Sequence, residues 1–188
     1  MKWTAQLLAA MALLAGCGGE RTTTETTYDI HPRALALGEV SPSAEAKDLA
    51  TLRRVTASFH DFDVAKHAGW SAPITDCMTS PAGGMGFHFG NPEFINGSVR
   101  VDEPELLLYE PESNGRMRLV AVEYIIPNAD WHSAQPPRLF GRDLQPNAQF
   151  QVWALHVWVW ENNPAGIFAD WNPNVNCDHT TAVSTMSH

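Results

Sequence analysis

The stretch MRLVAVEYII, from Met117 to Ile126, decides the fold class of this chain. It is rich in β-branched and aliphatic residues, which favour a strand. Just ahead of it, Asn114-Gly115 is the dipeptide typical of a tight hairpin turn. On the other side of that turn lies a second apolar run, LLLYE at Leu106 to Glu110. Two strands joined so closely pair antiparallel, so the sequence predicts an antiparallel sheet.

Two further runs extend this sheet. GMGFHFGN contains a predicted strand from Gly86 to Phe89, and FQVWALHVWVW predicts a strand from Phe150 to Trp160. Asn96-Gly97 is a second hairpin signal. The stretch from Pro127 to Pro146 predicts a long irregular connection. Consecutive hairpins indicate a curved sheet or partial barrel.

One long helix is expected ahead of the sheet. Ser41 and Pro42 offer an N-cap and a first-turn proline, and His67 and Gly69 mark the expected end and its left-handed cap. Apolar residues recur between them at three- and four-residue spacing: Leu49, Leu52, Val55, Phe59 and Phe62. A short C-terminal helix is predicted after Asn163-Pro164. The predicted class is α+β, with the helices packed on the antiparallel sheet.

The N-terminus resembles an export signal. Lys2 precedes an apolar run from Leu7 to Leu14 that is too short to span a membrane. The residues Leu14-Ala15-Gly16-Cys17 resemble a bacterial lipobox, which predicts a signal peptide over residues 1–16 and a lipid anchor on Cys17. The alternative is an ordinary signal peptide that happens to contain a cysteine. Gly18 stands where lipoproteins kept in the inner membrane usually have Asp, so the expected location is the cell envelope, at the outer membrane facing the periplasm.

Composition sets the remaining boundaries and excludes one class of partner. Residues 17–40, rich in Thr and charge, predict a flexible tether, residues 41–180 a single globular domain, and residues 181–188 a tail. The net charge of −9 lacks the basic footprint that nucleic-acid binding needs. The expected partners are the membrane, through the Cys17 lipid, and a small-molecule ligand. The sequence indicates no particular protein partner.

Two cysteines remain after the predicted anchor, Cys77 and Cys177. In a chain that works outside the cytoplasm, a disulfide between them is the economical interpretation. The alternative, two thiolates on a metal, ranks lower because no CxxC spacing is present.

Three polar residues interrupt apolar strands and form the candidate site. Glu123 falls on a face shared with apolar neighbours: Met117, Leu119, Ala121 and Ile125. His156 likewise shares a predicted face with Phe150, Val152, Ala154, Trp158 and Trp160. His88 lies between two phenylalanines, and nearby glycines leave room for a ligand or another backbone. His60, at the edge of the helical stripe, is a further candidate member.

Two imidazoles and a carboxylate are a common set of ligands for a divalent metal such as zinc, iron or copper. The first prediction is therefore a buried site at His88, Glu123 and His156 for a metal or small ligand. The alternative is purely structural: hydrogen-bonded core residues that set strand register. No GxSxG elbow or phosphate loop is present, so the sequence leaves catalysis undecided.

A different kind of binding protein is also consistent with the sequence. Its tryptophans could form an aromatic surface for an apolar or sugar ligand, with the histidines purely structural. The candidates for that surface are Trp131, Trp153, Trp158, Trp160 and Trp171.

Several motifs together resemble a family of uncharacterised exported bacterial proteins and lipoproteins. The pieces that carry the resemblance are FHD at 59–61, AGW at 68–70, GMGFHFGNP at 84–92, LLLYEP at 106–111, VEYIIP at 122–127 and LHVWVWENNPAGIFADWNPNVNC at 155–177. The resemblance implies a single exported domain, and the family brings no activity with it.

Overall fold

The computed structural model describes residues 43–180. The predicted signal peptide 1–16, the Cys17 anchor, the tether to residue 40 and the tail 181–188 lie outside this range. Within it the fold is α+β, as the sequence predicts: a six-stranded antiparallel sheet, curled into a half-barrel, with short helices on one face. The described residues contain no helix with the length and apolar character needed to cross a membrane.

The strand order in the large sheet is β1-β2-β3-β4-β8-β7, and β5 and β6 form a separate two-stranded sheet. The bounds of the strands are β1 Ala72–Ser80, β2 Gly83–Gly90, β3 Leu106–Pro111, β4 Met117–Pro127, β5 Arg138–Leu139, β6 Arg142–Asp143, β7 Gln145–Asn147 and β8 Val152–Val157. The sequence predicted four of the six large-sheet strands, but β1 and β7 were missed.

The two Asn-Gly signals have different outcomes. Asn114-Gly115 forms the tight connection between β3 and β4, and the positive φ of 79° at Gly115 explains why glycine is placed there. Asn96-Gly97 instead lies inside the long loop between β2 and β3. The prediction of a tight hairpin there was wrong, because no strand forms from Val99 onwards until Leu106.

The prediction of one long N-terminal helix was also wrong. The chain forms α1, Ala44–Thr56, then a 3₁₀ turn, η1, Ala57–His60, and finally α2, Phe62–His67. Asp61 causes the interruption: its extended backbone leaves the helix, and its carboxylate accepts N–H bonds from Asp63 and Val64 as the N-cap of α2.

The ends of the helical segment follow ordinary capping chemistry. Ser43, rather than the predicted Ser41, caps α1 by accepting the N–H of Ala46. Gly69, with φ of 111°, terminates α2 as predicted. The short helix predicted after Asn163-Pro164 is absent from the described chain up to residue 179, which forms turns there.

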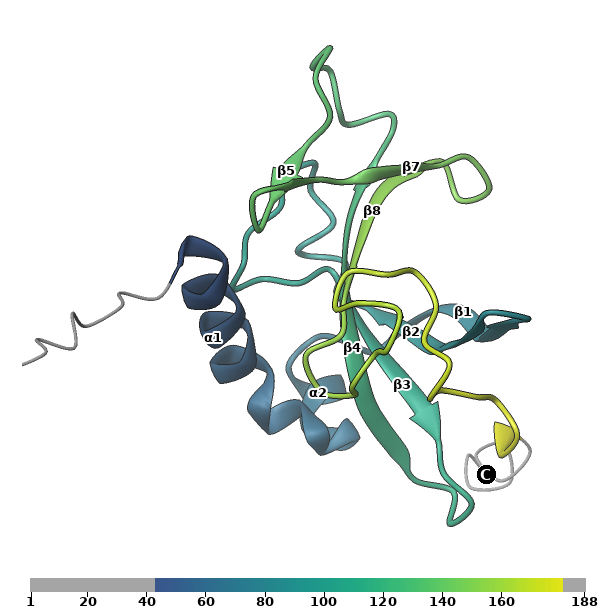
Figure 1. Cartoon of the computed structure of the whole chain (residues 1–188). Helices are drawn as coiled ribbons and strands as arrows, with labels where there is room; N and C mark the ends of the chain where they lie inside the picture. The colour runs from purple at the N-terminus through teal and green to yellow at the C-terminus, as the bar shows by residue number, and fades with distance from the viewer. Residues whose placement is uncertain (1–42, 181–188) are drawn as a thin grey trace, which may run out of the picture. The chain divides into compact units, whose positions relative to one another are not determined.

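Two apolar cores lie on opposite faces of the sheet. On one face α1 and α2 pack against the sheet through Leu52, Ala65, Tyr109 and Tyr124. On the other face the C-terminal segment packs against it through Val175. Figure 1 shows α1 and α2 to the left of the sheet and the β1–β2 hairpin projecting to its right. The central strands β3 and β4 are consequently buried on both faces.

A bulge in β4 changes the predicted alternation around Glu123. The register against β3 shifts at Val120, whose carbonyl accepts N–H bonds from Trp160 and Glu161. Two predicted neighbours of Glu123 therefore pack on the helix-covered face instead: Met117 and Leu119.

The alternation also reverses after β8. The Val159 N–H bonds to the Val157 carbonyl at 3.0 Å, which forms a tight turn at Trp158. Trp158 stays on the face away from the helices, whereas Trp160 packs in the helix-side core and donates its Nε1–H to Thr56. The prediction that Trp160 shares a face with His156 was therefore wrong.

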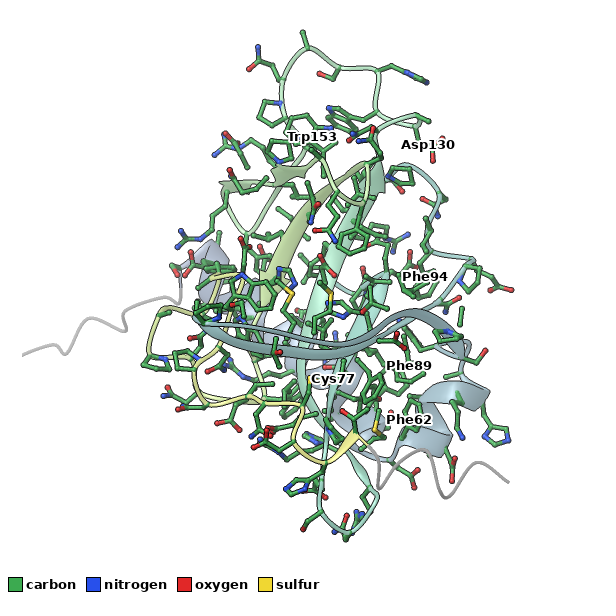
Figure 2. The ribbon with its side chains drawn as sticks, turned by 90° about the vertical axis from the view of Figure 1, so that its right-hand side faces the viewer. Phe62, Cys77, Phe89, Phe94, Asp130 and Trp153 are labelled. Atoms are coloured by element: carbon green, nitrogen blue, oxygen red, sulfur yellow. A yellow bond between two sulfur atoms is a disulfide. The ribbon has the colours of Figure 1, made fainter. Side chains whose placement is uncertain are left out.

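A disulfide joins Cys77 on β1 to Cys177 in the C-terminal segment, as predicted. The bond closes a loop with a sequence separation of 100 residues. In Figure 2, β1 crosses in front of the strands behind it, with Cys77 labelled along its length. The bond thus fixes the curled edge of the sheet to the segment that covers this face.

Candidate metal centre

The sheet brings His88, Glu123 and His156 together from three different strands. Glu123 on β4 lies directly opposite His156 on β8. His88 on β2 is separated from β4 by β3, so its side chain reaches the other two across the curled face of the sheet. One potential ligand atom from each residue lies within 4.8 Å of the others. All three side chains are buried, which explains why they stand on otherwise apolar strands.

The spacing within this cluster is that of metal ligands and not that of hydrogen bonds. The Nε2 atom of His88 lies 3.5 Å from Oε2 of Glu123, and the Nε2 atom of His156 lies 3.5 Å from Oε1. A hydrogen bond would need about 2.7–3.2 Å. Two ligand atoms on a tetrahedral ion with bonds of about 2.0–2.2 Å stand about 3.3–3.6 Å apart. Each imidazole therefore stands at the spacing of two metal ligands from the carboxylate oxygen that it faces, and one ligand atom from each of the three residues can be chosen within 4.8 Å of the others.

Neither ring nitrogen of His156 has a partner at hydrogen-bond distance within the described chain, although both atoms are buried; each faces a carboxylate at longer range instead. Leaving a buried polar group unpaired costs about 1–3 kcal/mol, so a purely structural core histidine would be expected to have a partner. A metal on Nε2 would satisfy one nitrogen. The other, Nδ1, lies 3.6 Å from the carboxylate of Asp170.

His88 is held more firmly. Its Nδ1 lies 2.8 Å from the hydroxyl of Thr75 on β1. When Nδ1 carries the proton and donates it, Nε2 keeps a free lone pair directed at Glu123. Contacts of this kind orient metal-binding histidines and set their tautomer.

Burial and the neighbouring charges set the protonation states. Desolvation, aided by His156, lowers the pKa of His88 to about 3. Desolvation raises the pKa of Glu123, with His156 acting in the opposite sense. Burial alone would lower the pKa of His156, but the carboxylates of Glu123 and Asp170 outweigh it and the pKa is raised. His88 is therefore neutral at pH 7, the form of imidazole that binds metals.

The glycines beside His88 serve backbone packing. Gly86 has φ of 85°, and a Cβ atom there would lie 2.4 Å from the Tyr109 carbonyl oxygen. Gly84 exchanges two backbone hydrogen bonds with Asn172 in the C-terminal segment. The sequence left open whether these glycines make room for a ligand or for another backbone. In the structure, another backbone approaches closely at Gly84 and Gly86.

A cavity of about 400 Å³ opens from the cluster. β1 forms one wall through Ile74, Thr75 and Met78, and the β7–β8 region forms another. The remaining lining is largely apolar and comes from several strands and loops: Met85, Leu106, Ile125, Phe150, Val152, Ala154 and Trp171. A metal bound by the three residues would thus keep coordination positions facing a space of ligand size.

The other candidate residues lie elsewhere. His60 is exposed and contacts the Trp160 ring at a centroid distance of 4.4 Å, so it does not join the cluster. Trp153 and Trp160 belong to the helix-side core, while Trp158 and Trp171 pack on the opposite face. Trp131 lies in a loop, where its Nε1–H bonds to a backbone carbonyl. The tryptophans do not share one surface, although Trp171 lines the cavity.

Thr75, Asp170 and Glu105 were not anticipated from the sequence. Thr75 belongs to the strand that was missed, and Asp170 lies in a loop with no periodic pattern. Glu105 is 1% exposed and accepts the N–H of Ile125. The one available signal for Glu105 was a carboxylate next to the apolar run LLLYE.

No protein-family model, curated protein or solved structure matches this chain. The resemblance to exported bacterial proteins therefore stays a prediction.

Proposed function

We propose that this chain is an envelope protein, held to the outer membrane by a lipid on Cys17, that binds one divalent transition-metal ion through His88, Glu123 and His156. The observation that carries the metal proposal is the 3.5 Å spacing between each Nε2 and the carboxylate oxygen that it faces, together with a buried His156 whose ring nitrogens both lie beyond hydrogen-bond distance from their neighbours. A satisfied core cluster would have closed to hydrogen-bond distance.

Two imidazoles and one carboxylate suit zinc, iron(II) and copper(II). The absence of a thiolate from the cluster disfavours the softest ions, and both mature cysteines are engaged in the disulfide. When bound with open positions, such an ion polarises a substrate oxygen or lowers the pKa of bound water. The residues around it orient the ligands: Thr75 holds His88, and the Asp170 carboxylate faces His156.

The test compares metal content and affinity among paired variants of residues 18–188, purified without an affinity tag. Glu123→Gln removes the ligand charge at nearly constant shape and is expected to weaken zinc binding by at least about 100-fold, more than the loss of an orienting contact. Glu105→Gln is the matched control, because it changes another buried glutamate outside the cluster. His156→Ala and His60→Ala form a second pair. Equal zinc affinity in wild type and Glu123→Gln would overturn the metal proposal.

The lipid anchor has a separate test. With Cys17→Ser, the protein is expected to move from the membrane fraction to the soluble envelope fraction while its zinc affinity stays unchanged. An unchanged membrane fraction would overturn the anchor without affecting the metal site.

A further inference from the structure

The charged side chains that line the cavity limit the net charge of a ligand that can bind there. The lining contains no Lys or Arg among the described residues, and its charged groups are Glu123, Asp170 and the two histidines. With a divalent ion bound, its two positive charges are balanced by the carboxylates of Glu123 and Asp170, so an anion taken from water into this space finds no excess positive charge to offset its lost hydration.

A cation is disfavoured for a different reason. A metal on Glu123 and the histidines places its own positive charge at the inner end of the cavity. An ammonium group entering there would be repelled by it and has no lone pair to offer as a ligand. The remaining class is an uncharged molecule that presents a neutral oxygen or nitrogen donor to the inner end.

The side chains that line the cavity indicate the polarity of the rest of the ligand. Apolar side chains line both sides, from Ile74 and Met78 on β1 to Val152 and Ala154 on β8. The amide side chains of Gln145 and Asn147 on β7, and of Gln149 in the loop that follows, are also part of the lining. Apolar walls favour an apolar body, and a few polar groups serve to orient it.

The cavity also has an apolar rim. Phe150 is 42% exposed and lines the cavity. Next to it, Gln151 has φ of 56°, an uncommon conformation for a residue with a side chain, and this conformation belongs to the turn that enters β8. Exposed phenylalanine at the edge of an apolar cavity is consistent with a contact to a ligand that enters past it.

We infer that the cavity binds a small, uncharged, mainly apolar molecule whose single polar group points at His88, Glu123 and His156. This inference deepens the proposed function and rests on it for the metal-facing end alone. The cavity volume of about 400 Å³ lies within the range of small-molecule sites, about 300–1,000 Å³, and would accommodate a molecule of one to two rings.

The test uses three probes with the same ring system: 2-naphthalenemethanol, 2-naphthoate and 2-naphthylmethylamine. Their binding is measured by calorimetry at pH 7 on the metal-free and the zinc-loaded protein. The alcohol is expected to bind saturably to both forms, and more tightly with zinc. Both charged probes are expected to bind to the zinc-loaded protein at least tenfold more weakly than the alcohol. Equal or tighter binding of either charged probe to the zinc-loaded protein would overturn the inference.

Variants then locate the binding. Val152→Phe fills the cavity and is expected to abolish binding of the alcohol, whereas Val64→Phe makes the same change at an exposed position on α2. Phe150→Ala changes a partly exposed rim residue and is expected to weaken binding several-fold. Binding that neither cavity variant affects would overturn the inference.

Failure of this inference is distinguishable from failure of the metal proposal. Metal content is read separately by elemental analysis, and the metal-free protein reports on the cavity by itself. Zinc bound at the cluster without saturable alcohol binding in either form would refute the ligand class and leave the metal site standing. Alcohol binding without any zinc affinity would refute the metal site and leave the cavity standing.

Discussion

Glu105→Gln is expected to make the protein more stable at neutral pH while leaving its stability in acid almost unchanged. Glu105 is buried, and desolvation raises its pKa from 4.5 to about 8. The folded protein therefore keeps this carboxyl protonated over a pH range in which the unfolded chain has released the proton. Stability falls as the pH rises from 4.5 to about 8, because the folded state binds more protons than the unfolded state there.

The magnitude follows from the width of that range. Each unit of pKa difference corresponds to about 1.4 kcal/mol, so ionisation of the unfolded chain costs about 3 kcal/mol of stability at pH 7. Glutamine mimics the protonated acid: its amide oxygen can still accept the Ile125 N–H at the position of Oε2. The variant has no titrating group at this position, so its free energy of unfolding does not fall over this pH range.

The assay is urea denaturation of metal-free wild type and Glu105→Gln at pH 5, 6, 7 and 8, with the disulfide intact. The two proteins are expected to have similar free energies of unfolding near pH 5, and the variant is expected to gain about 3 kcal/mol by pH 7. Parallel stability curves over the whole range would show that Glu105 has an ordinary pKa in the folded protein and would refute the reasoning.

Four other perturbations probe the cluster and its supports. Asp170→Asn, which removes the charge facing His156, is expected to lower zinc affinity by about 10- to 100-fold in a chelator competition assay, and unchanged affinity would remove Asp170 from the site. Thr75→Val keeps the side-chain shape but deletes the contact with His88; a similar loss of affinity is expected, with about 1 kcal/mol of stability lost in urea denaturation. Replacing Cys77 and Cys177 together by Ser is expected to cost about 2–5 kcal/mol of unfolding free energy, and a loss well below that range would mean that the bond does not restrict the unfolded chain. Zinc affinity is expected to fall as the pH is lowered from neutral, because the raised pKa of His156 lets protons compete with zinc for the imidazole already above pH 6.5. An affinity independent of pH would exclude His156 as a ligand.

The sheet was predictable where local signals were strong. Asn114-Gly115 between two apolar runs specified the β3–β4 hairpin, and both strands formed close to their predicted bounds. β1 was missed because its apolar residues show no regular alternation, its side chains are largely half-exposed, and Pro73 lies near its start. The helix prediction overlooked Asp61: the apolar spacing continues through it, but its capping side chain favours a new helix start.

The members of the cluster were also predictable, because a histidine or carboxylate on an apolar strand needs a partner. Their convergence was not. Glu123 and His156 face each other through strand register, but His88 reaches them only because the sheet curls. Thr75 reaches His88 through the irregular register of β1, and Asp170 reaches His156 through the path of the C-terminal segment. Neither feature has a periodic pattern in the sequence.

A crystal structure of the zinc-loaded protein, with anomalous data collected on both sides of the zinc absorption edge, tests the central claim most directly. The account predicts a single strong zinc peak within about 2.0–2.2 Å of the Nε2 atoms of His88 and His156 and a carboxylate oxygen of Glu123. A peak at any other place, or no peak while both imidazoles keep their positions around an unfilled gap, would contradict it.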